Sequence, residues 1–121
     1  MAILVERDVM VPMRDGVRLA TDVYRPDDDG PHPVLVQRTP YDKSFAWFTG
    51  GLIVNPLTAV DRGFVVVSQD VRGRSASEGT WTPFVNESND GYDTVEWAAE
   101  QPWSTGNVGV FGSSYLGVTS L

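Results

Sequence analysis

The sequence predicts an α/β fold in which an N-terminal β-hairpin leads into a mostly parallel sheet flanked by helices. Three observations support this class. Residues 3–24 read as a β-hairpin, in which residues 17–24 alternate with the period of a strand. The later segments 33–38 and 64–70 begin with uninterrupted apolar runs, which is typical of strands covered on both faces. Helix signals lie between the later strands, and strand–helix–strand connections favour parallel pairing.

The hairpin is predicted from its alternation and its turn. Arg14, Asp15 and Gly16 supply turn chemistry, because Gly16 can adopt a positive φ. After the turn, two sets of side chains alternate: Val17, Leu19, Thr21 and Val23 with Arg18, Ala20, Asp22 and Tyr24. This period-two pattern predicts a strand with one solvent-exposed face. A loop over 25–31 then leads to the strand at 33–38.

Helix signals follow in two places. Residues 55–63 read as a short helix, with Asn55 as the N-cap, Pro56 at the first helical position and Gly63 just past the end. After the strand at 64–70 and a loop over 72–79, residues 88–101 are predicted to form an amphipathic helix. Its apolar face is assigned to Tyr92, Val95 and Ala99, which recur at helical spacing. Ala98 lies beside this stripe, and Trp97 lies off it.

The last elements are a strand, a turn and the start of a helix. Residues 107–111 are predicted to be a third buried strand, and a further helix begins at Tyr115. A parallel sheet is covered by its crossover helices, yet this last helix has only about two turns of sequence. We therefore expect residues 1–121 to be the N-terminal portion of a larger catalytic domain.

Composition narrows the classes of partner. Sixteen acidic and nine basic side chains give a net charge of -7, which argues against nucleic acid or an anionic membrane as the partner. Cysteine is absent, so thiolate metal sites are excluded. The acidic run 27–29 is interpreted as a solvated turn, and no metal or cofactor is expected. No signal peptide or apolar span of about 20 residues is seen, so a cytoplasmic location is the expectation.

A serine lies where the last strand turns into a helix. Gly112 and Gly117 flank Ser114 in the pattern G-x-S-x-x-G, which differs from the common G-x-S-x-G because Leu116 replaces the second glycine. Such an elbow presents a nucleophilic hydroxyl above a sheet. The alternative is an ordinary strand–turn–helix junction. Ser113 is less suitable, because it has no glycine two positions before it.

An acyl-transfer site also needs donors for the developing oxyanion. The N–H of Tyr115, directly after the serine, opens a helix and is the first candidate. A second donor usually comes from the loop after an earlier strand, and Tyr41 occupies that place. From its position alone, Tyr41 could equally be a tyrosine packed against a loop.

Four segments spread along nearly the whole chain are informative together: Met13–Leu19, Arg38–Lys43, Gln69–Gly79 and Asn107–Thr119. In sequence and in order they resemble the cocaine esterase and X-prolyl dipeptidyl-peptidase family of serine hydrolases, which has the α/β-hydrolase fold.

The resemblance implies roles for individual residues. Ser114 is implied to be the acyl-accepting nucleophile, and the Tyr115 N–H with the Tyr41 hydroxyl to form the oxyanion hole. Leu116 stands where the α-amino acid ester hydrolase branch carries an acidic residue, which favours the cocaine-esterase-like branch.

Residues near these positions are given structural or binding roles. The charged residues at and after the end of the second buried strand are interpreted as a hydrogen-bonded loop that braces the strand end, with a direct catalytic part as the alternative: Asp70, Arg72 and Glu78. Trp47 and Phe48 could line an acyl pocket or pack in the core.

The general base is not found in this chain. Serine hydrolases of this fold place the triad in the order Ser, acid, His, whereas the single histidine, His32, precedes the serine. His32 also lies before a strand, at the end opposite the predicted catalytic edge. The resemblance implies that the acid and base, a helical insertion and a C-terminal β-sandwich lie beyond residue 121.

Two functions follow from this reading. The first is a segment of a serine hydrolase that cleaves a small ester or amide, including an X-prolyl peptide bond, while this chain alone is inactive. The second is a truncated half-domain that serves as an interaction or dimerisation module, so a homodimer is left open.

Overall fold

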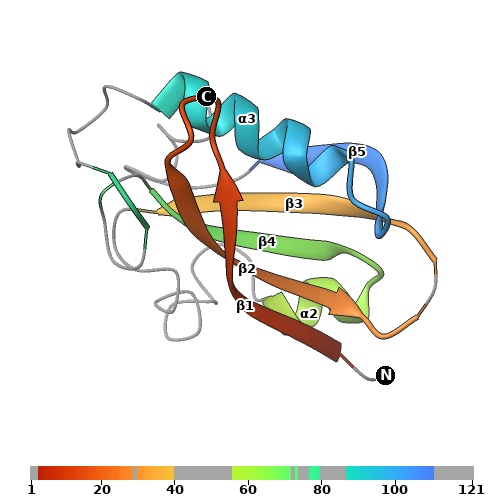
Figure 1. Ribbon diagram of the computed structural model, residues 1–121. Coiled ribbons are helices and arrows are strands. Elements are labelled where there is room, and N and C mark those ends of the chain that lie inside the picture. Colours follow the sequence, from red (N-terminus) through yellow and green to blue (C-terminus); the bar gives the residue numbers. More distant parts are fainter. Residues whose placement is uncertain are drawn as a thin grey trace.

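The computed structural model describes residues 3–28, 30–39, 56–71, 73, 77–79 and 87–110. Its elements, in chain order, are β1 (Ile3–Pro12), β2 (Arg18–Pro26), β3 (His32–Thr39), α2 (Pro56–Asp61), β4 (Val65–Asp70), α3 (Glu87–Ala99) and β5 (Ser104–Val110). The strands form one five-stranded sheet in the order β1-β2-β4-β3-β5 (Figure 1). β2 is antiparallel to both β1 and β4, whereas β4, β3 and β5 run parallel. The predicted α/β class, a hairpin followed by a parallel sheet with helices, is confirmed.

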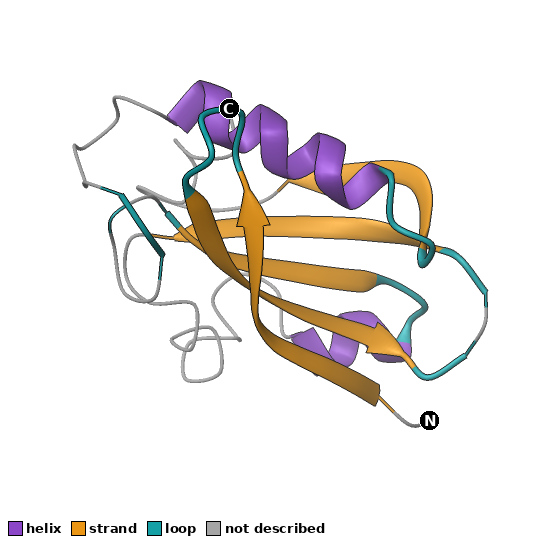
Figure 2. Ribbon diagram, in the orientation of Figure 1, coloured by secondary structure: helices purple, strands orange, loops and turns teal. Residues whose placement is uncertain are grey.

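The two helices cover opposite faces of the sheet (Figure 2). On one face, Ala98 of α3 packs into a cluster of valines: Val23, Val34, Val36, Val65 and Val67. On the other face, Ala59 and Val60 of α2 pack against Tyr24 and Val66. Successive strand residues point to opposite faces, so the uninterrupted apolar run of β4 supplies both clusters.

The predicted turn and helix signals have the expected geometry. Gly16 has a φ of 86° in the turn between β1 and β2. Pro56 is the first residue of α2, where its missing N–H costs no helical hydrogen bond. Gly63 ends that helix with a φ of 92°, and its N–H donates to the Val60 carbonyl at 2.9 Å. Asn55, the predicted N-cap, lies outside the described residues.

The prediction that β2 has a solvent-exposed face is wrong. Ala20, Asp22 and Tyr24, which belong to the predicted wet face, are fully buried. β2 lies between β1 and β4 in the sheet, and α2 covers Tyr24. The alternation therefore separates two buried faces of different polarity, not a dry face from a wet one.

The predicted apolar face of the second helix is also wrong. Tyr92 is 61% exposed, whereas the fully covered positions of α3 are Asp90, Thr94 and Ala98. Thr94 is buried because its hydroxyl joins a hydrogen-bonded group on the sheet. Tyr92 instead places its ring 5.9 Å from the guanidinium carbon of Arg14.

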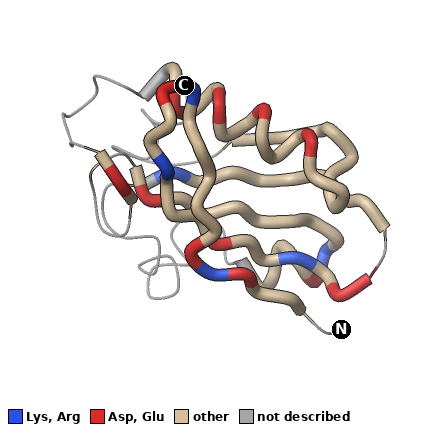
Figure 3. Tube along the Cα trace, viewed as in Figure 1, with Lys and Arg blue, Asp and Glu red and all other residues tan. Residues whose placement is uncertain are grey.

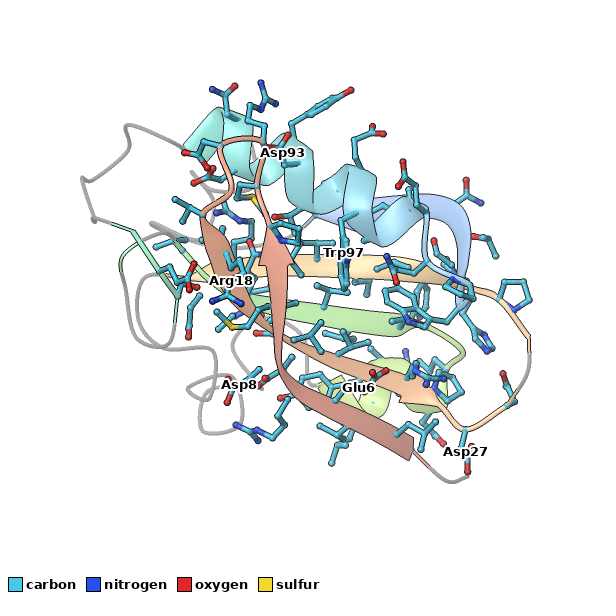
Figure 4. All side chains as sticks on the ribbon, viewed as in Figure 1. Glu6, Asp8, Arg18, Asp27, Asp93 and Trp97 are labelled. Carbon is cyan, nitrogen blue, oxygen red and sulfur yellow. The ribbon has the colours of Figure 1, made fainter. Side chains whose placement is uncertain are left out.

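Trp97, which lies off the predicted stripe, packs toward the sheet. It contacts the valine cluster under α3 as well as the hairpin cluster around Leu19. Its ring makes an edge-on contact with Trp103, with 5.9 Å between centroids. The labelled side chain extends from α3 toward the strands (Figure 4).

The third parallel strand differs from its prediction. β5 begins at Ser104, before the predicted start at 107, and most of its residues are exposed, including Val110 at 44%. The reason is its place in the described sheet, where it pairs with β3 along one side and forms an edge. Phe111 and the helix predicted from Tyr115 lie outside the described residues.

Candidate active site

The three parallel strands bring their carboxyl ends to one edge of the sheet. Thr39 at the end of β3 pairs with Asp70 at the end of β4. On the other side of β3, Val36 pairs with Val110 at the end of β5. Ligands of open α/β sheets bind outside the carboxyl ends of the strands. This edge is therefore the candidate active site.

The predicted catalytic residues follow two neighbouring strands at this edge. Tyr41 comes after β3, and Ser114 and Tyr115 come after β5. All three lie outside the described residues, as do Arg72, Trp47 and Phe48. The structure thus establishes that β3 and β5, the strands that precede these two segments in the sequence, are adjacent and parallel. The roles of the three side chains stay predictions.

A buried group of polar side chains, which we call the edge network, lies on the α3 face just inside this edge. Its members come from β2, β3, β4 and α3, and each is at most 2% exposed: Thr21, Arg38, Gln69 and Thr94. Gln69 is the centre of the network. Its Oε1 accepts a hydrogen bond from Arg38 Nε at 2.7 Å and lies 2.9 Å from Thr94 Oγ1. Its Nε2 donates to Thr21 Oγ1 at 3.1 Å.

The network extends to the backbone at both ends. The Thr21 hydroxyl donates to the Leu19 carbonyl at 3.1 Å. The Thr94 hydroxyl also lies 2.8 Å from the Asp90 carbonyl, so its single proton is directed to that oxygen or to Gln69. Because α3 and three strands contribute, the network fixes the helix relative to the end of the parallel sheet.

The opposite face of the same strands carries a second buried polar row. Asp22, Ser68 and Gln37 are neighbours across β2, β4 and β3, and all are buried. A bulge in β1 serves Asp22: Asp8, with a φ of 53°, donates its N–H to Asp22 Oδ1 at 3.0 Å. Arg7 Nη2 lies 3.6 Å from Asp22 Oδ2. The bulge thus gives a buried carboxylate both a backbone donor and a cation.

The segment after β4 is tied back to β2. The Ser77 hydroxyl donates to the Asp70 carbonyl and accepts from the Ala20 N–H, both at 2.7 Å. Arg18 binds Glu78 through its side chain, with 2.7 Å between Nη2 and Oε2, and through its own N–H. Hydrogen bonding from the Arg18 guanidinium holds the pKa of the Glu78 carboxyl below its ordinary value. For Glu78, these contacts agree with the predicted bracing role, whereas Asp70 takes part through its backbone carbonyl.

His32 lies at the other end of the parallel strands. It is the first residue of β3, and its Nε2 lies 2.8 Å from Asp28 Oδ1. That hydrogen bond lowers the pKa of the Asp28 carboxyl. Two labels in Figure 4 mark the ends of β2. Arg18, its first residue, lies near the catalytic edge, and Asp27, just after the strand, lies at the end where β3 begins with His32. A pocket of about 350 Å³ at this far end is lined by Glu6, Arg25, Asp28, Gly30, Pro102 and Trp103.

Sequence reasoning missed the edge network. Gln69 was grouped with the strand, and Thr21 and Thr94 were given no role. The available signal was the change from Val65–Val67 to Ser68, Gln69 and Asp70 within one buried strand. A buried amide needs partners, so polar residues at the end of such a run indicate a hydrogen-bonded group.

The described part of the chain carries neither of two other kinds of site. Among those residues, no group of three or more His, Asp or Glu side chains is arranged to hold a metal ion. None of the described helices has the length and apolar character needed to cross a bilayer. Acidic side chains recur along α3 and in the hairpin (Figure 3).

Comparison with known proteins adds family evidence. A family model described as X-Pro dipeptidyl-peptidase (S15 family) matches residues 15–121. The chain is 58% identical over 117 residues to a cocaine esterase from a Rhodococcus species, covering 95% of this chain and 20% of that protein.

Solved structures agree with this match. A CocE/NonD family hydrolase from Staphylococcus aureus superposes with a TM-score of 0.84 at 35% identity, over 98% of this chain and 25% of that one. An α-amino acid ester hydrolase gives a TM-score of 0.82 at 32% identity, over 97% of this chain and 22% of that one. The chain therefore spans about a fifth to a quarter of the length of these relatives.

Proposed function

Because this chain belongs to the X-Pro dipeptidyl-peptidase (S15) family of hydrolases, we propose that the protein containing it is a serine hydrolase acting through an acyl-serine intermediate. The observation that supports this most directly is the adjacency of β3 and β5 in the parallel sheet. It brings the segment with Tyr41 and the segment with Ser114 out of neighbouring strands at one edge. A nucleophile and an oxyanion donor need that proximity.

Each predicted site residue has a defined part in the reaction. The Ser114 hydroxyl adds to the substrate carbonyl carbon while its proton passes to a histidine base that lies beyond residue 121. The negative charge that develops on the carbonyl oxygen is stabilised by the Tyr115 N–H and the Tyr41 hydroxyl. Collapse of this intermediate breaks the bond to the leaving group, which takes the proton from the histidine. Water then attacks the acyl-serine and releases the acid, restoring the Ser114 hydroxyl.

For the substrate we propose an ester of a small molecule. The relative with 58% identity is named a cocaine esterase, and one structural neighbour is named an α-amino acid ester hydrolase. Leu116 replaces the acidic residue of the latter branch with an apolar side chain, which disfavours recognition of a substrate amino group. Cleavage of an X-prolyl peptide bond is the alternative within the same chemistry, following the family description.

The proposal is tested by labelling the intact protein with a fluorophosphonate, which reacts with activated serines. We expect one labelled site, lost in Ser114→Ala and retained in Ser113→Ala, a matched control one residue away. Label that persists in Ser114→Ala would contradict the nucleophile assignment. Loss of label in Tyr41→Phe to the same extent as in Ser114→Ala would show that Tyr41 does more than stabilise the oxyanion.

A second candidate is a non-catalytic half-domain that binds another protein or a second copy of itself. Among the described residues β5 pairs with β3 alone, which favours this reading, because a strand edge without a partner can accept another strand. The nucleotide sequence after codon 121 separates the two. A reading frame that continues into an aspartate and a histidine supports the hydrolase, whereas a stop codon supports the half-domain.

A further inference from the structure

We propose that Gln69 is a positioning residue that holds the buried guanidinium of Arg38 and thereby orients the carboxyl end of β3, from which the Tyr41 segment leaves. This inference rests on the proposed function and adds a residue that does not touch substrate. It is supported by the edge network of Thr21, Arg38, Gln69 and Thr94.

The first property is its place in the sheet. Arg38 and Gln69 are paired neighbours in the parallel ladder, and the next pair, Thr39 and Asp70, ends both strands. The 2.7 Å hydrogen bond between them therefore joins β3 and β4 at the last position before the catalytic edge. In the sequence, Tyr41 follows Arg38 with only Thr39 and Pro40 between them. The ring of a proline restricts its own φ and the residue before it, so little backbone freedom separates Arg38 from Tyr41.

The second property is charge. The guanidinium of Arg38 is buried and stays ionised at every working pH. A buried charge is tolerated when hydrogen bonds replace its water, and a short bond to a carbonyl oxygen is such a replacement. Gln69 supplies that oxygen at 2.7 Å. The position of Arg38 is thus tied to the position of the Gln69 amide.

The third property is that the amide has a single workable orientation. Oε1 lies within hydrogen-bonding distance of two donors, Arg38 Nε and Thr94 Oγ1. Nε2 faces Thr21 Oγ1, whose own proton is directed to the Leu19 carbonyl. Reversing the amide would point its NH₂ group at the guanidinium and its oxygen at a hydroxyl that has no proton free. Gln69 therefore acts as a directional clamp and not merely as a polar filler.

The expected effect follows from how an oxyanion hole works. Its donors stabilise charge only when they are already placed where the oxyanion forms, and a displacement of about 1 Å can cost about 100-fold in rate. A loosened Arg38 would leave the Tyr41 hydroxyl less well placed in the transition state. Ground-state binding of the substrate would change much less. The signature is a fall in kcat with little change in KM.

The experiment uses the intact protein and ester hydrolysis. We expect Gln69→Met, which keeps the length of the side chain but removes both the acceptor and the donor, to lower kcat about 10-fold to 100-fold. Gln69→Glu keeps the acceptor for Arg38 but loses the donor to Thr21, so it should retain more activity than Gln69→Met. Val67→Ala is the control for stability alone, since Val67 lies on the same face of β4 in the valine cluster. It should lower the melting temperature without the same fall in kcat.

A second background tests whether the effect passes through Tyr41. In Tyr41→Phe, we expect Gln69→Met to add little further loss, because the group that it positions is already gone. Equal losses in both backgrounds, or unchanged kcat in Gln69→Met, would overturn the proposal. If Gln69→Met does not fold, Arg38→Lys takes its place, because lysine keeps the charge but lacks the Nε donor, and the same Tyr41-dependent loss is expected.

Failure of the proposed function would look different. If Ser114→Ala retained full turnover, the site assignment itself would be wrong, whatever the Gln69 variants did. Suppose instead that Ser114→Ala were inactive, while every Gln69 variant kept both its fluorophosphonate labelling and its kcat. Only the positioning role would then be rejected.

Discussion

Several buried polar side chains of this protein have specific hydrogen-bond partners. Gln69 on one face of β4 binds Arg38, and Asp22 on the adjacent strand receives the Asp8 N–H from a bulge. At the surface, Arg14 forms a two-pronged contact with Asp93, with 2.8 Å between Nη2 and Oδ1. That contact joins the hairpin turn to α3, two segments far apart in the sequence.

The Arg14–Asp93 pair should make the free energy of unfolding depend on pH. Its hydrogen bond from Arg14 lowers the pKa of the Asp93 carboxyl, so the folded state favours the ionised form. The resulting stabilisation is present above the unfolded pKa of about 3.9 and disappears as the pH falls through the lower folded value. We expect Asp93→Asn to reduce stability modestly at pH 7 and to have a smaller effect as the pH falls toward 2. Urea unfolding of both proteins across this range measures the difference.

Glu96→Gln provides the control for that experiment, because it removes an exposed carboxylate from the same helix. Its unfolding midpoint should stay close to that of the unmodified protein at both pH values. A difference between Asp93→Asn and the unmodified protein that stayed constant down to pH 2 would contradict the electrostatic explanation.

At the scale of elements, α3 shows where periodicity misleads. The helix was correctly placed, but its buried face is formed by Asp90, Thr94 and Ala98 and not by the stripe at Tyr92, Val95 and Ala99. Apolar spacing identifies a core face only when the core is apolar. Here the sheet presents Gln69 to the helix, so a threonine and a small residue face inward.

This assignment of the helix face predicts opposite outcomes for two substitutions. Ala98→Asp would bury a carboxylate without a partner among the valines and should cost about 3–5 kcal/mol. Tyr92→Gln changes an exposed side chain and should alter stability by about 0.5 kcal/mol or less. Chemical denaturation of the intact protein provides both values. The assignment would be wrong if Tyr92→Gln were the more damaging change.

At the scale of the whole molecule, the sheet ends in an edge that the described residues do not cover. β5 pairs with β3 on one side, and its outward residues are exposed. The chain also covers only about a fifth of its esterase relative. We therefore expect the isolated 121-residue polypeptide to be marginally stable and prone to associate through this edge.

The isolated chain should also be nearly inert as a catalyst. Its single histidine begins β3 at the end remote from the candidate site, and loss of the base from a serine–histidine pair costs many orders of magnitude in turnover. A chromogenic short-chain ester serves as the substrate, with the intact protein as the positive control. Turnover by the 121-residue chain at a rate near that of the intact protein would disprove this expectation.

The sequence by itself determined most of the element order, though not the start of β5, because element order depends on local signals such as the apolar run of β4, Pro56 and Gly63. It also identified the family, through motifs spread over nearly the whole chain. Tertiary structure alone decided which faces are buried, since a residue pattern does not specify what covers it. β2 is buried on both faces because Val23 packs in the cluster under α3 and Tyr24 packs against α2. Gln69 became the centre of a network because β2, β3 and α3 meet there. Contacts between residues so distant in the chain leave no periodic trace in the sequence.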